Sequence, residues 1–314
     1  MTGYIVRRLL ATIPVMILVG TGVFMLMKLT PGDPAGILLG DEATEERRQQ
    51  VREQLGLNDG IFTQYWNWAT NVLRGDLGDS IFLNQSVTSA LLDRAEPTLL
   101  LTFLSTVVAV AVGLPLGIIA ARKRGTWVDV STMAVAIVGI SMPTFWLGLN
   151  LILLFAVRNR WLPVAGFSPL EDGLWDSLRY MILPAITLGV AQAALLARMT
   201  RSMMLEVLNS DYVRTARAKG VREFGVVMVH AFRNALLPII NIIGLIVAGL
   251  LGGAVVTEQI FNIPGIGRLL IQAVSRRDFP VVQGTVLVIA TIYVLVNLIV
   301  DIAATALDPR VRKG

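Results

Sequence analysis

The sequence contains no cysteine among its 314 residues and only one histidine, His230. The lack of cysteine excludes disulfide bonds, thiolate metal sites and thiol nucleophiles, and it leaves the redox compartment open. Charged residues are also scarce, at 16% of the chain, whereas soluble globular proteins average about 25%. Because 54% of the residues are hydrophobic and gather in long uncharged stretches, the sequence predicts an integral membrane protein.

Residues that perform catalysis or hold nucleotides are missing as well. None of the four lysines is followed by serine or threonine, so the chain lacks the phosphate-binding loop G-x-x-x-x-G-K-[ST]. His230 has no H-E-x-x-H context, and no pair of carboxylates falls within a hydrophobic stretch. We therefore expect no catalytic residue, no metal site and no cofactor, and we assign His230 a structural or solvated role.

Six uncharged stretches are long enough for a helix to cross a hydrocarbon core of about 30 Å. The first follows Arg7 and Arg8, as in a signal peptide, but it exceeds the usual apolar region of roughly 7 to 15 residues and no small-x-small cleavage site follows it. The sequence therefore predicts an all-α membrane protein with six transmembrane helices, at Leu9–Met27, Pro97–Ala121, Val130–Val157, Tyr180–Ala197, Asn234–Thr257 and Phe279–Val300.

The distribution of basic residues predicts the orientation of these helices. With a cytoplasmic N-terminus, the inside segments hold 15 lysine and arginine residues and the two short outside loops hold six. Basic residues collect on the cytoplasmic side of membrane proteins, so both termini are expected to be cytoplasmic. This asymmetry also accounts for the pI of about 9.9, and we expect no nucleic acid partner.

The spans divide the chain into three predicted regions: an N-terminal region with the first helix (1–29), an extracytoplasmic loop subdomain (30–96) and a five-helix core (97–314). The loop contains an amphipathic stretch, Glu42–Leu57, with start signals at Thr44 and Glu45 and a stop signal at Gly56. It also contains an aromatic cluster, which we interpret as a small core or a set of interfacial anchors. The cluster comprises Phe62, Tyr65, Trp66 and Trp68.

The central parts of the predicted spans contain no Asp, Glu, Lys, Arg or His, and Glu258 and Asp301 lie just past span ends. Ion-coupled pumps and carriers generally use ionisable residues within the bundle. Their absence argues against such a carrier, although a stand-alone carrier that coordinates sodium through its backbone stays open. The outside segment Glu258–Pro280 is short and is punctuated by Pro264, Gly265 and Gly267, and it predicts either a lining for an entrance or an ordinary hairpin between helices.

The longest polar segment on the cytoplasmic side runs from Glu206 to Pro238, with the loop proper at 206–234. Ser210 or Asp211 can begin a helix and Gly220 can end it in the left-handed conformation. A second helix follows, with one apolar face, and could anchor the first helix to the bundle. We expect a docking surface, and the alternative is a basic loop that rests on anionic lipid. The apolar positions are Phe224, Val227, Met228, Ala231 and Phe232.

At these residues the chain resembles the membrane permease subunits of ABC importers, whose cytoplasmic loop carries E-A-A-x-x-x-G and then I-x-L-P. Ala216 and Gly220 match, Arg214 and Thr215 depart, and the second element is replaced by His230–Arg233 with Leu237–Pro238 farther on. DYVRTARAKG followed by HAFRNALLP is similar to the dipeptide and oligopeptide branch, which also includes permeases for glutathione and nickel chelates. The likeness extends over the chain, through RRLL (7–10), TPGDP (30–34), RGDLGDS (74–80), SMPTFW (141–146), RMTRSMMLEVL (198–208), NIPGIGRLL (262–270) and RRDFPVVQG (276–284).

The resemblance implies the architecture of a type I ABC importer permease and a multi-pass subunit in the cytoplasmic (inner) membrane of a prokaryote. It implies a pore-forming, non-enzymatic role in ATP-driven import of small peptides or a related solute. The implied partners are a second homologous permease, two cytoplasmic ATPase subunits, an extracytoplasmic solute-binding protein and the lipid bilayer. A sodium-coupled carrier and a membrane scaffold or receptor are the alternatives. The residues implied to couple to the ATPase are Arg214, Thr215, Ala216, Arg217, Ala218, Lys219 and Gly220.

Overall fold

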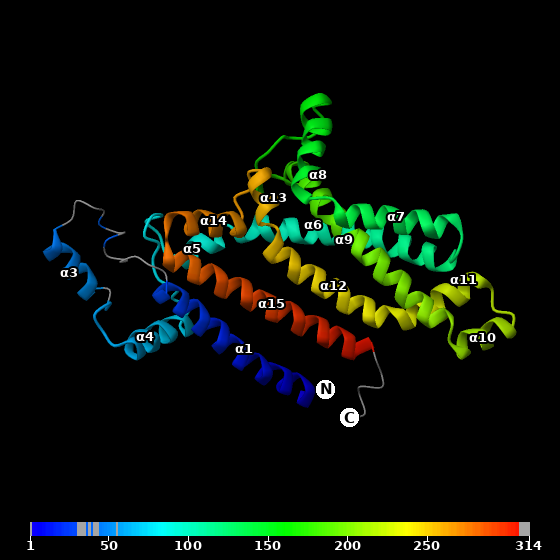
Figure 1. Ribbon diagram of the computed structural model, residues 1–314, viewed down its shortest axis with the longest axis horizontal. Helices are drawn as coiled ribbons and strands as arrows, with labels where there is room; N and C mark the ends of the chain where they lie inside the picture. Colours follow the sequence, from blue (N-terminus) through cyan, green and yellow to red (C-terminus); the bar gives the residue numbers. More distant parts are fainter. Residues whose placement is uncertain (1, 30–35, 37–38, 40–43, 55, 308–314) are drawn as a thin grey trace. The chain divides into compact units, whose positions relative to one another are not determined.

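The computed structural model describes residues 2–29, 36, 39, 44–54 and 56–307. Across these residues the regular structure is helical apart from one isolated bridge between Asp79 and Ser86, which confirms the predicted all-α fold. The motif Thr30–Pro34 lies outside the described residues. Figure 1 shows the main helices in chain order: α1 (Thr2–Leu29), α3 (Glu45–Gln54), α4 (Ile61–Leu73), α5 (Val87–Leu92), α6 (Ala95–Arg122), α7 (Trp127–Ser141), α8 (Thr144–Leu151), α9 (Leu174–Leu208), α10 (Asp211–Ala218), α11 (Glu223–Gly225), α12 (Arg233–Gly253), α13 (Val255–Ile260), α14 (Ile266–Arg276) and α15 (Phe279–Leu307).

The described chain divides into two compact units. The main unit contains Glu96–Arg268 and the part of α15 from Leu295 onward. The small unit contains Thr2–Ala95 and Leu269–Val294. The predicted regions 1–29, 30–96 and 97–314 stay a prediction.

Four helical segments of the described chain are long and apolar enough to cross a membrane: Val87–Arg122, Leu174–Leu208, Glu223–Gly252 and Phe279–Ala303. A bent pair, α7 followed by α8 and its continuation to Arg158, gives a fifth if it is counted as one span. Helix α1 carries a shorter apolar stretch, Leu10–Met25. Each predicted span therefore falls on a helix or a helix pair, while the number six and the cytoplasmic termini stay predictions.

The third predicted span, Val130–Val157, is divided into two helices. Helix α7 ends at Ser141, and the axis of the following segment is turned by 96°. Met142 has an extended backbone with φ −77° and ψ 123°. Pro143 explains this break, because its ring disfavours helical geometry at the preceding residue and it has no N–H to donate.

Small residues allow helices α6 and α9 of the main unit to lie close together. A Cβ atom on Gly113 would lie 2.7 Å from the carbonyl oxygen of Ala193, and one on Gly117 would lie 2.6 Å from that of Ala197. The two glycines are four residues apart and so share one helix face. Close backbone approach of this kind holds helices together in lipid. There, burial of apolar side chains contributes little free energy to helix association, because the lipid tails are equally apolar. This close approach fixes α9, the helix that leads into the polar segment from Glu206 onward.

Part of the predicted aromatic cluster forms a core within the small unit. Tyr65 and Trp68 of α4 pack against Phe24 of α1, with ring centroids 5.3 and 5.5 Å from it. The hydroxyl groups of Tyr65 and Thr21 are 2.9 Å apart and share a hydrogen bond. The other two members, Phe62 and Trp66, are 86% and 70% exposed. The cluster therefore contributes both a core and an apolar outer face of α4.

Candidate functional site

The segment that follows α9 folds as helix, glycine turn and helix, as the sequence predicts. Helix α9 continues to Leu208, so the predicted loop begins within its last turn. Helix α10 then spans Asp211–Ala218, preceded by Ser210 with an extended backbone. The Ser210 hydroxyl donates to the carbonyl oxygen of Val207 (2.6 Å) instead of capping α10. Ser210 thus marks the helix start by its backbone conformation.

Gly220 ends this helix in the way that the sequence predicts. Its φ is +78°, in the left-handed region that glycine adopts without steric cost. The N–H of Gly220 donates to the carbonyl of Arg217 (2.9 Å), and the N–H of Val221 donates to that of Ala216 (3.2 Å). This pair of bonds is the Schellman arrangement, which satisfies carbonyl groups left free at a helix end.

Burial separates the seven candidate residues into two groups. Of the candidates, Ala216 is buried (7% exposed). Together with its fully buried neighbour Val213, it lies on the side of α10 that packs against α9 and the π-helical segment η3 (Val226–Phe232) of the same chain. The small side chain of Ala216 therefore allows close packing within this chain. The other candidates lie on the exposed surface of the helix and its turn: Arg214, Thr215, Arg217, Ala218, Lys219 and Gly220.

Ion pairs organise part of this exposed surface. Arg217 donates to both carboxylate oxygens of Glu223, at 3.0 and 3.2 Å, and so connects the end of α10 to the start of α11. This carboxylate raises the pKa of the Arg217 guanidinium. Arg214 contacts Asp211 at 3.3 Å within the same helix, where both side chains are largely exposed. The surface is basic, yet two of its cations have partners within the segment.

The second helix runs directly into the next apolar span. A short α11 is followed by a π-helical segment, η3 (Val226–Phe232), and then by α12, and together they form one helical segment from Glu223 to Gly252. Val227 and Ala231 are buried as the predicted apolar face requires, whereas Phe224 is 71% exposed. The wide π turn changes the helical phase, which explains why a strict 3.6-residue period misplaced Phe224.

A buried ion pair next to this segment escaped sequence analysis. Asp129, 4% exposed at the start of α7, accepts hydrogen bonds from Nε and Nη2 of Arg201 on α9, at 2.5 and 2.7 Å. The N–H of Gly125 donates to the same carboxylate (3.0 Å). The pair joins residues 72 positions apart and fixes the end of α9 from which α10 continues. In the sequence, the position of Asp129 directly before the apolar stretch Val130–Val157 was the only indication of this ion pair.

A second buried carboxylate holds the glycine-rich segment before α14. Glu258 is fully buried, and it accepts hydrogen bonds from Thr98 Oγ1 (2.7 Å) and from the N–H of Arg268 (2.8 Å). Burial raises the pKa of Glu258. A Cβ atom on Gly265 would collide with this carboxyl group, which explains the glycine at that position. The segment is therefore pinned to the main unit.

The described residues contain no group of three or more histidine, aspartate and glutamate side chains placed to hold a metal ion. His230 lies half-buried in η3, and its carbonyl accepts a hydrogen bond from Asn234 Nδ2 (2.7 Å). The arrangement around α10 thus offers a charged, exposed helix fixed to a membrane bundle.

Comparison with known proteins identifies the family. The signature of the "Binding-protein-dependent transport system inner membrane component" matches residues 113–313, and its N-terminal counterpart matches residues 1–102. The "Probable peptide ABC transporter permease protein y4tP" of Sinorhizobium fredii (strain NBRC 101917 / NGR234) is 45% identical over 98% of this chain and 99% of its own length. The glutathione transport system permease protein GsiC of Escherichia coli (strain K12) is 43% identical over 99% of each chain.

Solved structures show the same fold. An inward-facing structure of the MetNI methionine ABC transporter superposes with a TM-score of 0.57 at 22% sequence identity, covering 70% of this chain and 96% of that one. The relatives and the fold give no support to a stand-alone carrier or a scaffold. The chain therefore belongs to the family of binding-protein-dependent transport system inner membrane components, as a multi-pass, non-enzymatic permease subunit of an ABC importer.

Proposed function

We propose that this permease carries short peptides, including glutathione-like peptides, across the cytoplasmic membrane of a bacterium. The observation that supports this solute class is the full-length likeness to two permeases named for a peptide and for glutathione, which is itself a small peptide. An ABC importer works with ATPase subunits and a solute-binding protein. We further propose six crossings, cytoplasmic termini and a second, homologous permease that completes the pore.

The exposed face of α10 is the proposed contact with an ATPase subunit. Thr215 and Ala218 expose small side chains, and Arg214, Arg217 and Lys219 surround them with positive charge. Val213 and Ala216 fix the opposite face to the chain's own helices. A surface helix packed in this way transmits a push on its outer face to α9 and η3. Transmission needs different contacts in the two states of the ATPase, which a docked helix can provide.

Import by the reconstituted complex tests the solute class. The permease pair, the ATPases and the solute-binding protein are placed in proteoliposomes, and uptake of a labelled dipeptide and of glutathione is measured with and without ATP. We expect ATP-dependent uptake of at least one of them. Uptake of neither, together with uptake of an unrelated solute such as a nickel chelate, would exclude the peptide proposal.

Site-specific cross-linking tests the contact at α10. Because the chain has no cysteine, a single cysteine at Thr215 can be cross-linked to the ATPase without background from the permease. We expect a cross-link whose yield changes with ATP. A cysteine at Phe62, which is exposed on α4, is the control and should give none. Equal yields at both positions would disprove the assignment.

A further inference from the structure

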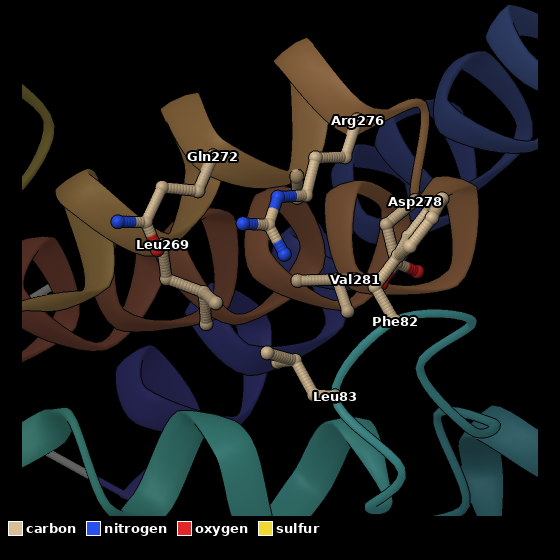
Figure 2. A pocket seen from close by; sticks show the side chains of 8 residues that line it. Phe82, Leu83, Leu269, Gln272, Arg276, Asp278 and Val281 are labelled. Carbon is tan, nitrogen blue, oxygen red and sulfur yellow. The ribbon is translucent and has the colours of Figure 1, made fainter.

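A small cavity in the small unit is lined by one exposed cation, Arg276, and by apolar side chains. The cavity has a volume of about 180 Å³ and is open on one side. Figure 2 shows the guanidinium of Arg276 on α14 near the side chain of Val281, with Leu83 below it, and Gln272 of the same helix beside Leu269. Leu269 and Phe82 complete the apolar part of the lining. The cavity thus combines one guanidinium group and one amide with aliphatic and aromatic surface.

The positive charge in this cavity is not neutralised by the residues that the structure describes. No carboxylate among them lies within ion-pair distance of Arg276. Asp278 lines the same cavity, but its Oδ2 accepts a hydrogen bond from Ser80 Oγ (2.5 Å) and its Oδ1 accepts one from Ile81 N–H (3.3 Å). Both oxygens therefore have other hydrogen-bond partners, and the guanidinium retains donors for a ligand.

A second cavity of the small unit has the opposite charge. It encloses about 460 Å³ and shares the Ser80–Asp278 region, because Ser80, Ile81 and Pro280 line it. Asp59 and Asp79 supply carboxylates, Asn67 and Asn71 supply amides, and Trp68 supplies an aromatic face. Gln64, on the wall of this cavity, accepts a hydrogen bond from Lys28. The cavity lined by Arg276 and the cavity lined by Asp59 and Asp79 therefore both adjoin the hydrogen bond between Ser80 and Asp278.

We propose that the cavity at Arg276 binds the terminal carboxylate of a peptide, with the terminal side chain on the floor formed by Leu83, Leu269 and Val281. A guanidinium suits a carboxylate because it can donate two parallel hydrogen bonds to it. The neighbouring acidic cavity favours a ligand that carries an amino group in addition to the carboxylate. A peptide carries both groups, whereas an acidic side chain of a partner protein carries only the carboxylate. This inference rests on the proposed peptide solute and on an outer location of α14.

Import at saturating, fully loaded solute-binding protein tests the proposal. Arg276→Ala should slow import of a peptide with a free carboxylate by about tenfold, the effect of losing one charge-assisted hydrogen bond. Arg276→Lys should lose less, because the charge stays. Arg277→Ala is the matched control, since Arg277 is adjacent and basic but does not line the cavity, and it should import at the wild-type rate.

The same peptide with an amidated C-terminus, compared at equal occupancy of the binding protein, identifies the carboxylate. Wild type should import the amide about tenfold more slowly, and Arg276→Ala should add no further loss, because both changes remove one interaction. The inference would be overturned if amidation and Arg276→Ala each slowed import and their two effects multiplied when combined. It would also be overturned if Arg276→Ala imported the free-carboxylate peptide at the wild-type rate. Weaker binding of the unloaded binding protein to Arg276→Ala would overturn it as well, because that result would assign the carboxylate to that protein. If wild type imports no peptide, the proposed function fails instead.

Discussion

Arg217 and Glu223 lie on opposite sides of the Gly220 turn and form a two-point ion pair, with Nη2–Oε1 at 3.0 Å and Nε–Oε2 at 3.2 Å. The pair closes the turn that sets the direction of α10 relative to α11. Both side chains are a little under half exposed, so water screens the interaction and its contribution is about 0.5 to 1 kcal/mol.

We expect Glu223→Gln to lower solute-stimulated ATP hydrolysis about two- to fivefold, which is the same free energy expressed as a ratio. The measurement compares ATPase rates of reconstituted complexes with and without loaded binding protein. Glu206→Gln is the control, because Glu206 is an exposed carboxylate of the same segment without a described ion pair. A full rate in Glu223→Gln would show that the pair does not orient α10.

Gly220→Ala tests the left-handed turn alone. A Cβ atom at Gly220 would meet nothing within 4 Å, so the expected cost is the backbone strain at φ +78°, about 1 to 2 kcal/mol. We expect weaker solute-stimulated ATP hydrolysis with normal membrane insertion. Gly252→Ala is the matched control, since its Cβ would also be free of contacts but the residue is helical. A similar loss in both variants would exclude backbone strain as the cause.

The two alanines of α10 should respond differently to a large side chain. Ala216→Trp has no room against η3 and α9, so we expect overpacking by about 1 to 3 kcal/mol and a lower melting temperature of the complex. Ala218→Trp lies on the exposed face and should keep the melting temperature while abolishing ATP-driven import. The opposite pattern would mean that the inner and outer faces of α10 are assigned the wrong way round.

Asp129→Asn removes the charge that pairs with Arg201 in a mostly buried site. We expect destabilisation of about 2 kcal/mol or more, because a guanidinium is left near the bundle without its counter-charge. The double variant Asp129→Asn, Arg201→Gln should recover part of the loss. Thermal denaturation in detergent measures all three proteins. A double variant less stable than either single variant would contradict the pairing.

Glu258 predicts a pH dependence with a defined sign. Its pKa in the folded protein is raised, so the protonated form is favoured by folding. The stabilisation is therefore complete below the ordinary pKa of about 4.5 and decreases as the pH rises through the raised value. We expect the melting temperature of wild type to fall with rising pH relative to Glu258→Gln, whose amide does not titrate. Parallel curves for the two proteins would refute the assignment.

Local signals predicted the ends of helices well. Gly56 and Gly220 both adopt positive φ and end α3 and α10 with the same pair of backbone hydrogen bonds. A glycine followed by an apolar residue is enough information, because the geometry involves only neighbours in the sequence. The apolar stretches likewise predicted the helices, since membrane helices satisfy their backbone groups internally.

Contacts between distant residues could not be predicted in this way. Asp129 and Arg201 are separated by 72 positions, and Thr98 and Glu258 by 160. Proline was ambiguous as well: Pro143 breaks a helix, whereas Pro115 and Pro184 lie inside α6 and α9. In the candidate site, the sequence predicted the helix and its turn but not that Ala216 faces inward, because that depends on where η3 lies.

The π-helical segment η3 has a geometric consequence for the short helices α10 and α11 that precede it. A π turn contains one residue more than an α turn, and it can give up that residue by shifting its hydrogen bonds without unfolding. Each residue of an α-helix corresponds to a rotation of about 100° and an advance of 1.5 Å. Conversion of Val226–Phe232 to α geometry would therefore swivel α11 and α10 about the axis of α12 while the membrane-spanning part of that helix keeps its register.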